Sequence, residues 1–150
     1  MNQTELQDEV KILRGQVHCY TANLRRLQRL NDLLTELEAV QQSTGSGLIV
    51  ISKDSPSGNG EQSRLQLIED LEFCRREIEV TQYAIRQVNN FISCLKNKED
   101  KQLIRLYAKG WTYQALADQF GYTDDGIDKR LRNLMKARIL KTVRTPPCQP

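Results

Sequence analysis

Histidine is almost absent from the 150-residue sequence, in which His18 is the single example. The four cysteines lie far apart, and no two of them have the CxxC spacing of a zinc or redox motif. The chain therefore lacks the ligands of a zinc site and the base of a histidine-dependent nucleophile, so we expect no metal, no cofactor and no enzymatic activity. Cysteines spaced in this way are typical of reduced cytoplasmic thiols.

Long apolar runs are also missing. No stretch approaches the roughly 20 consecutive apolar residues that a membrane-spanning helix needs, so we expect no membrane partner. The opening residues, MNQTELQDEV, have neither the basic region nor the apolar core of a secretory signal peptide. Apolar residues make up 39% and charged residues 27% of the chain, which is typical of a globular or coiled-coil protein.

Positive charge is concentrated in the last third of the sequence. The chain has 22 Lys and Arg against 19 Asp and Glu, which gives a net charge of only +3. Residues 1–95 carry 10 basic and 13 acidic side chains, whereas residues 96–150 carry 12 basic and 6 acidic ones. A basic segment on a slightly acidic body favours a polyanionic partner, although a solvated basic helix face would have the same composition.

Two stretches carry apolar residues at the alternating spacing of four and three that is typical of coiled coils. They predict one helix over residues 4–42, with Thr4 as its N-cap, and a second over residues 62–95. The apolar seam consists of Leu6, Val10, Leu13, Val17, Tyr20, Leu24, Leu27, Leu30, Leu33, Leu34, Leu37 and Val40 in the first helix, and of Leu67, Leu71, Cys74, Ile78, Thr81, Ile85, Val88, Ile92 and Leu95 in the second. We expect a long antiparallel hairpin that self-associates through residues 4–95 into a dimer or a higher oligomer, because one hairpin covers its seam thinly.

The segment between these helices is rich in Ser, Gly and Asn, which favour turns. We expect a loop over residues 43–61. It contains the β-branched run Leu48–Ile51, which fits a short strand that pairs with its copy in a partner chain and fits a mobile loop equally well.

Residues 96–143 read as a small domain of three helices, followed by a disordered tail over residues 144–150. The first helix, Glu99–Lys109, ends at Gly110, and the second covers Tyr113–Phe120. Thr112 and Thr123 are expected to cap the second and third helices, and Gly121 to supply the positive φ of the turn between them. Trp111 is expected to be wedged among the helices, as are Phe120, Tyr122 and Ile127.

The pattern of this domain is that of a helix-turn-helix, whose second helix enters the DNA major groove. Ala117 is small where two helices cross, and Ile127, Leu131 and Leu134 form the buried face of the last helix. The fold class expected for the whole chain is therefore all-α, a coiled-coil hairpin followed by a helix-turn-helix domain. A three-helix bundle with basic solvent-facing residues would carry the same pattern.

The stretch GWTYQALADQFGYTDDGIDKRLRNL resembles the region-4 helix-turn-helix of sigma-70-type factors. The matching positions are Gly110, Thr112, Ala117, Gly121, Thr123, Ile127, Arg130, Leu131 and Arg132. Arg132 lies one residue earlier than the corresponding arginine of the sigma-factor pattern. The departures from the pattern are Leu116 and Phe120. The layout of long paired helices, a Ser/Gly loop and this motif resembles phage and prophage regulators of the ArpU/RinA type. That resemblance implies a transcription regulator that activates late phage genes with host RNA polymerase in the bacterial cytoplasm.

The last helix supplies the expected DNA contacts. Asp128, Lys129 and Arg132 are the residues expected to touch base edges, since Arg can grip guanine and Asp can accept from cytosine. Phosphate contacts are expected from basic residues and from the two capping threonines with their helix N-termini, namely Arg130, Lys136, Arg138, Lys141, Thr112 and Thr123. Asp124 and Asp125 are expected to act as helix caps or to contact a protein such as a polymerase subunit.

Two other functions fit the same features. A small terminase subunit, which packages phage DNA, also combines a helix-turn-helix with coiled-coil parts, but there the DNA-binding part is expected to come first. A coiled-coil interaction protein would need no DNA at all. A ring of eight or more subunits would favour the terminase, and a lack of salt-dependent DNA binding would favour the interaction protein.

Overall fold

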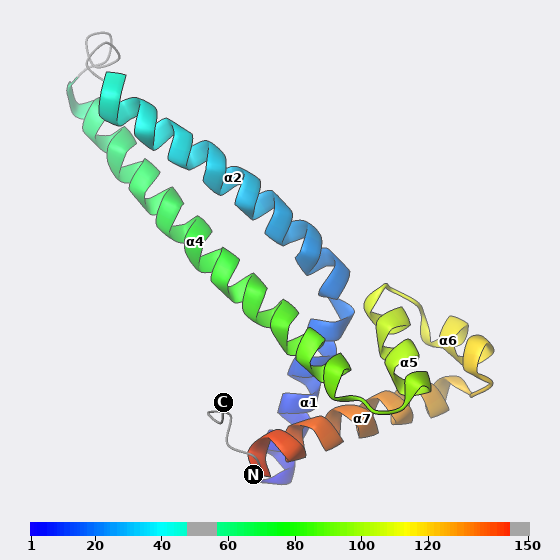
Figure 1. Cartoon of the computed structure of the whole chain (residues 1–150). Helices are drawn as coiled ribbons and strands as arrows, with labels where there is room; N and C mark the ends of the chain where they lie inside the picture. Colours follow the sequence, from blue (N-terminus) through cyan, green and yellow to red (C-terminus); the bar gives the residue numbers. More distant parts are fainter. Residues whose placement is uncertain (48–56, 145–150) are drawn as a thin grey trace. The chain divides into compact units, whose positions relative to one another are not determined.

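The computed structural model describes residues 1–47 and 57–144, and every regular element in these residues is a helix (Figure 1). The helices are α1 (Gln3–His18), α2 (Tyr20–Gly47), α4 (Ser57–Cys94), α5 (Lys98–Ala108), α6 (Tyr113–Phe120) and α7 (Asp124–Arg144). The all-α prediction is confirmed. The predicted strand at 48–51 lies outside the described residues, as does the predicted tail over 144–150 except for Arg144, which is the last residue of α7.

The chain forms two compact units that do not follow the predicted domain limits. The hairpin unit consists of residues 24–83. The helix-turn-helix unit consists of residues 1–23 together with the chain from residue 84 onwards. The boundary therefore falls inside both long helices, α2 and α4, rather than after residue 95.

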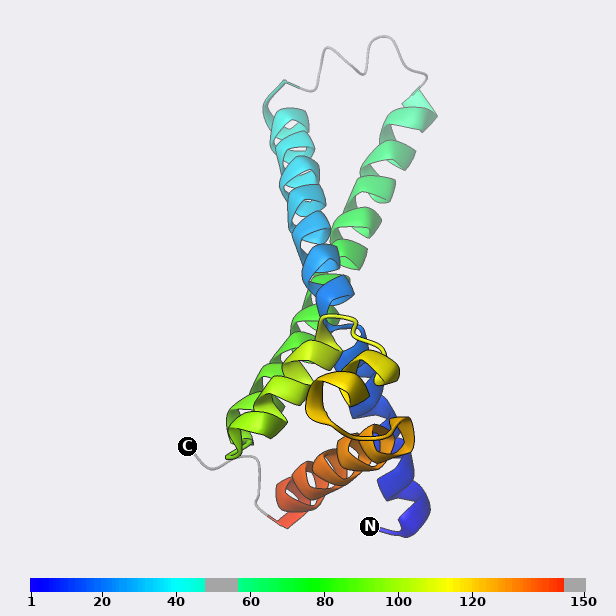
Figure 2. The ribbon, with the colours of Figure 1, turned by 90° about the vertical axis from the view of Figure 1, so that its right-hand side faces the viewer.

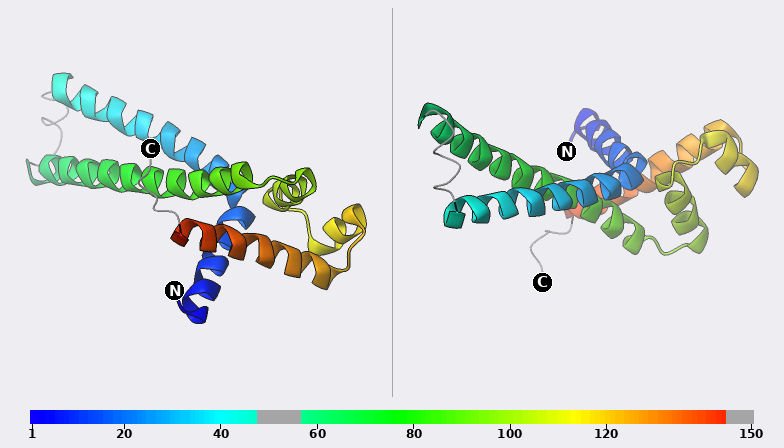
Figure 3. Two further views of the ribbon diagram at one scale, coloured as in Figure 1. Left: turned by 60° about the horizontal axis from the view of Figure 1, so that its bottom comes forward. Right: turned by 90° about the horizontal axis from the view of Figure 1, so that it is seen from above.

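In the hairpin unit α2 and α4 run antiparallel, as the seams predict (Figure 3). The buried cluster contains Leu30, Cys74 and Ile78, and the Cys74 thiol donates a hydrogen bond to the Leu30 carbonyl at 3.2 Å. Burial raises the pKa of this thiol. An ion pair of 2.9 Å joins Arg26 to Glu77 at the edge of the same seam.

The predicted single helix over residues 4–42 is wrong, because the structure interrupts it at Cys19. Cys19 is the C-cap of α1: its backbone leaves the helical geometry, with a φ of −91° and a ψ of 6°, while its N–H still donates to the carbonyls of Gly15 and Val17. The N-cap is Asn2 instead of Thr4. The Asn2 side chain accepts from the Glu5 N–H at 2.8 Å, and the Glu5 carboxylate accepts from the Asn2 N–H at 3.2 Å, which is a reciprocal capping box.

The helix-turn-helix unit has one apolar core, which α1, α5, α6, α7 and the C-terminal end of α4 surround (Figures 1 and 2). The prediction that Ile127 and Leu131 are buried is confirmed, since both are fully enclosed. Other fully buried side chains are Val17 from α1, Val88 and Phe91 from α4, Ile104 from α5, Leu116 from α6 and Met135 from α7. Burying these side chains is the main source of stability in this unit.

Two aromatic side chains lie outside this core, contrary to expectation. Trp111 is 37% exposed and Tyr122 is 42% exposed. The Tyr122 hydroxyl instead donates to the Glu99 carboxylate at 3.1 Å, which ties the turn to the start of α5. Each follows a positive-φ glycine, and the tight turn carries its side chain away from the core.

The caps predicted for α6 and α7 and the two turn glycines, Gly110 and Gly121, are confirmed. The Thr112 hydroxyl accepts from the Ala115 N–H at 3.2 Å, and the Thr123 hydroxyl accepts from the Gly126 N–H at 3.0 Å. Gly121 ends α6 with a φ of +75° in the left-handed region. The α6–turn–α7 geometry therefore arises from side chains that are local in sequence.

Two glycine substitutions should change the free energy of unfolding in opposite directions. Gly121→Ala should lower it by about 1 kcal/mol, because alanine is strained at positive φ even though no atom would touch the added Cβ. Gly15→Ala should raise it by about 1 kcal/mol, since Gly15 lies in a helix with open space around it. Urea denaturation of both variants measures the two changes, and a shift in the same direction for both would contradict the assignment.

Candidate nucleic-acid interface

The face of α7 that points away from the core is polar and accessible. Exposed or half-buried side chains on this face are Asp125, Lys129, Arg132, Asn133 and Lys136. Lys129 and Asn133 are separated by four residues, so they lie one above the other on the helix. Asn133 was not among the predicted site residues, although its position opposite the buried Ile127 and Leu131 could have identified it. An asparagine on such a face can bind adenine through two hydrogen bonds.

Asp128 lies at the edge of this face and is fully engaged within the protein. Arg14 binds one of its carboxylate oxygens and Arg132 binds the other, and the Asp128 side chain is only 26% exposed. The hydrogen bond from Arg14 lowers the pKa of Asp128 against the opposing effect of burial, and Arg132 lowers it further. The structure thus gives Asp128 a role in joining α1 to α7, whereas the sequence predicted contact with a base edge.

The ion pair on Asp128 should make stability depend on pH in the acid range. Because the pKa of Asp128 in the folded protein lies below its unfolded value, the pair stabilises the fold above about pH 4 and is lost as the pH falls below that. Asp128→Asn should lower the free energy of unfolding by about 1 kcal/mol at pH 7, and the difference from the unsubstituted protein should shrink at pH 3. Urea denaturation at both pH values measures this, and an equal difference at both would contradict the assignment.

Two further predicted phosphate contacts are also engaged within the protein. Arg130 donates from Nε and Nη2 to Oδ1 of the buried Asp100 at 2.9 and 2.6 Å, and so ties α7 to α5. The Arg130 side chain as a whole remains 41% exposed. Arg138 donates to the Cys94 sulfur at 3.2 Å. In contrast, Lys129 is exposed on the outer face of α7.

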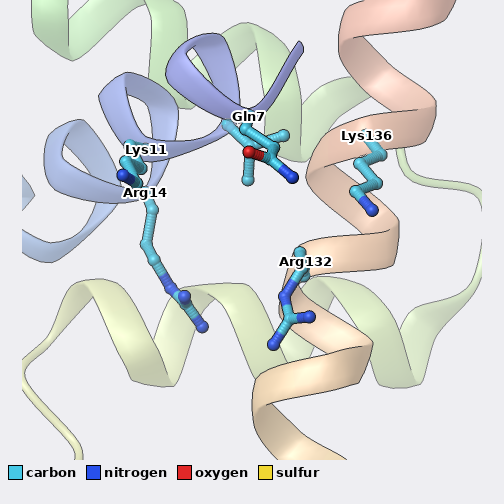
Figure 4. Close-up of a pocket in the computed structure, with 6 residues that line it drawn as sticks. Gln7, Lys11, Arg14, Arg132 and Lys136 are labelled. Carbon is cyan, nitrogen blue, oxygen red and sulfur yellow. The ribbon is translucent and has the colours of Figure 1, made fainter. Parts of the chain in front are cut away.

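A basic pocket of about 230 Å³ lies between α1 and α7 (Figure 4). It is lined by Gln7, Val10, Lys11 and Arg14 from α1, and by Arg132 and Lys136 from α7. Four of these six side chains are cationic. Among the described residues, the buried Nε of Arg14 is a donor without a hydrogen-bond partner. Lys11 and Arg14 were not among the predicted site residues, because their helix was expected to pack only in the coiled coil.

The pocket adjoins the N-terminus of α6. The Arg14 guanidinium carbon lies 5.6 Å from the centre of the Tyr113 ring, in a cation–π contact. Burial, together with the neighbouring Tyr107, raises the pKa of Tyr113 to about 12, so its hydroxyl stays neutral. Thr112, the cap of α6, directly precedes Tyr113. A basic pocket and a helix N-terminus, both favourable for anions, therefore occupy one region of this unit.

Comparison of the chain with known protein families, curated proteins and solved structures finds no match. No helix in residues 1–47 or 57–144 is long and apolar enough to cross a membrane. Across those same ranges, no group of three or more His, Cys, Asp or Glu side chains is arranged to hold a metal ion.

Proposed function

We propose that the chain is a sequence-specific transcription regulator that binds duplex DNA through α7. The observation that carries this proposal is the combination of two features on one helix. The inner face of α7 is fixed by fully buried Ile127, Leu131 and Met135, while its outer face presents exposed Lys129, Asn133 and other polar side chains. A rigid helix with such a face, preceded by a tight turn and a second capped helix, fits the major groove.

The proposed contacts fall into two groups. Lys129, Arg132 and Asn133 read base edges, because they lie on the accessible face and carry donors that match guanine or adenine. Lys11 and Lys136, at the basic pocket, neutralise phosphates beside the groove, and the N-termini of α6 and α7 with Thr112 and Thr123 bind phosphates through backbone N–H groups. Asp128 supports these groups by holding Arg132 and Arg14 in place.

Three finer parts of the proposal come from the sequence. The chain forms a homo-oligomer, because paired helix-turn-helix units read two half-sites and bind more tightly than one. It activates late phage genes together with host RNA polymerase, as the resemblance to regulators of the ArpU/RinA type implies. The exposed Asp124 and Asp125 at the start of α7 offer a contact for a polymerase subunit.

Salt-titrated binding to duplex DNA tests the main proposal. The full chain should bind a selected duplex more tightly than a scrambled one, and the affinity should fall steeply between about 50 and 200 mM salt. Absence of binding at the lower salt concentration would contradict the proposal and favour an interaction protein. Mass measurement of the free protein separates the remaining alternative, since a ring of eight or more subunits would indicate a small terminase subunit.

A further inference from the structure

A second apolar stripe runs along α4 in the hairpin unit, on the side opposite the seam that packs against α2. The buried seam in this part of α4 contains Leu71, Cys74 and Ile78. The stripe consists of side chains that are about half exposed, namely Leu65 at 56%, Ile68 at 46%, Phe73 at 53%, Val80 at 64% and Tyr83 at 54%. A row of five large apolar side chains on one helix of a small protein marks an interaction surface.

The spacing of this stripe is symmetric. The face is formed by residues 65, 68, 72, 76, 80 and 83, whose steps are 3, 4, 4, 4 and 3, so one side of the helix carries all of them. Position 74 is the midpoint, with Leu65 and Tyr83 equally far from it on either side. Glu72 and Arg76, both exposed, lie two residues from the midpoint and carry opposite charges. Phe73 lies next to the midpoint along the helix, at the edge of this face, about 100° around the helix axis from Glu72.

This symmetry identifies a second copy of the chain as the partner. In an antiparallel pair with a two-fold axis near position 74, Leu65 faces Tyr83 of the partner subunit and Glu72 faces Arg76 of the partner subunit. A parallel pair in register would bring Glu72 against its own copy and Arg76 against its own copy, which places like charges together. Charge complementarity therefore favours the antiparallel pair.

We propose that two copies of the chain pair antiparallel along this face of α4, with the two-fold axis at the level of position 74. Apolar contact between the two stripes supplies the stability, and the two Glu72–Arg76 pairs set the direction and the register. The proposal deepens the homo-oligomer part of the proposed function by naming the surface, the partner and the orientation. Residues outside the stripe, including the face that packs against α2, are left unchanged by pairing.

Charge reversal in the full-length protein tests the proposal. Glu72→Arg and Arg76→Glu should each raise the dimer dissociation constant about 10-fold, because each reversal creates two like-charge contacts. The double variant Glu72→Arg/Arg76→Glu should restore dimerisation, since it recreates both pairs with exchanged signs. Glu36→Arg and Arg29→Glu, at exposed positions on α2, are matched controls with the same change in net charge and no expected effect. Sedimentation equilibrium measures the constants, and circular dichroism verifies that each variant is folded.

The outcomes are distinct. Weakening by each single reversal, with restoration in the double variant, supports the antiparallel pair. An unsubstituted protein that is monomeric at high concentration overturns it, as does a double variant that stays weakened or single variants that match their controls. DNA binding is measured separately on a duplex with one half-site, which a single helix-turn-helix unit can occupy. If the unsubstituted protein does not dimerise but still binds the half-site duplex, this inference alone is refuted. If the unsubstituted protein does not bind the half-site duplex, the proposed function is refuted.

Discussion

Replacing Lys129 and Asn133 together with alanine is expected to lower affinity for the preferred duplex about 100-fold, since each base-reading side chain contributes about 1–3 kcal/mol. Both side chains are exposed on the outer face of α7, one turn apart, and the opposite face of the helix is buried. Binding to a scrambled duplex should change much less, because phosphate contacts remain. Fluorescence anisotropy with both duplexes at one salt concentration measures the ratio.

A second pair of substitutions distinguishes contacts with base edges from contacts with phosphates. Lys11→Gln/Lys136→Gln removes two cations at the basic pocket and should weaken binding to all duplexes equally, with a reduction of about 2 in the slope of log affinity against log salt. Arg29→Gln/Arg64→Gln removes the same charge from the hairpin unit and is the control. If Lys129→Ala/Asn133→Ala instead weakened both duplexes equally, these residues would be phosphate contacts and another surface would read the sequence.

Local features of the helix-turn-helix were predictable because their causes lie within a few residues. The hydroxyls of Thr112 and Thr123 accept hydrogen bonds from N–H groups three residues ahead. Gly121 adopts a positive φ, which depends on the backbone of that residue alone. The seam of α4 was predictable for a similar reason, since a strict period fixes which face of a helix is apolar. Leu71 and Cys74 are buried as expected.

The apolar spacing shows which face of a helix is buried, but it does not show which other element packs against that face. The spacing of Val10 and Val17 is the same whether α1 packs in a coiled coil or on α5 and α7, and the structure has the second arrangement. The pairing of Asp128 with Arg14 depends on that arrangement, because the two residues are 114 positions apart in the chain. For this reason the spacing could not show that Asp128 pairs with Arg14 or that Lys11 lies beside α7.

Replacing Leu13 with alanine is expected to lower the free energy of unfolding of the helix-turn-helix unit by about 3 kcal/mol. Leu13 is 8% exposed and belongs to the core that Ile104, Leu116 and Leu131 also build. Removal of its side chain leaves a cavity between α1 and that core. The adjacent Ile12 is 55% exposed, so Ile12→Ala should change the free energy by less than about 0.5 kcal/mol and is the matched control.

Urea denaturation, followed by the fluorescence of Trp111, the single tryptophan, which lies in this unit, measures the change in the unit itself. Equal effects of Leu13→Ala and Ile12→Ala would contradict the packing of α1 against α5 and α7. The predicted domain over residues 96–143, produced alone, should for the same reason lack a cooperative unfolding transition. It would lose the buried side chains of Val10, Leu13, Val17, Val88 and Phe91, whose burial at about 1.5–3 kcal/mol each is comparable to the whole stability of a small domain. The first helix is therefore as much a part of the helix-turn-helix unit as the turn between α6 and α7.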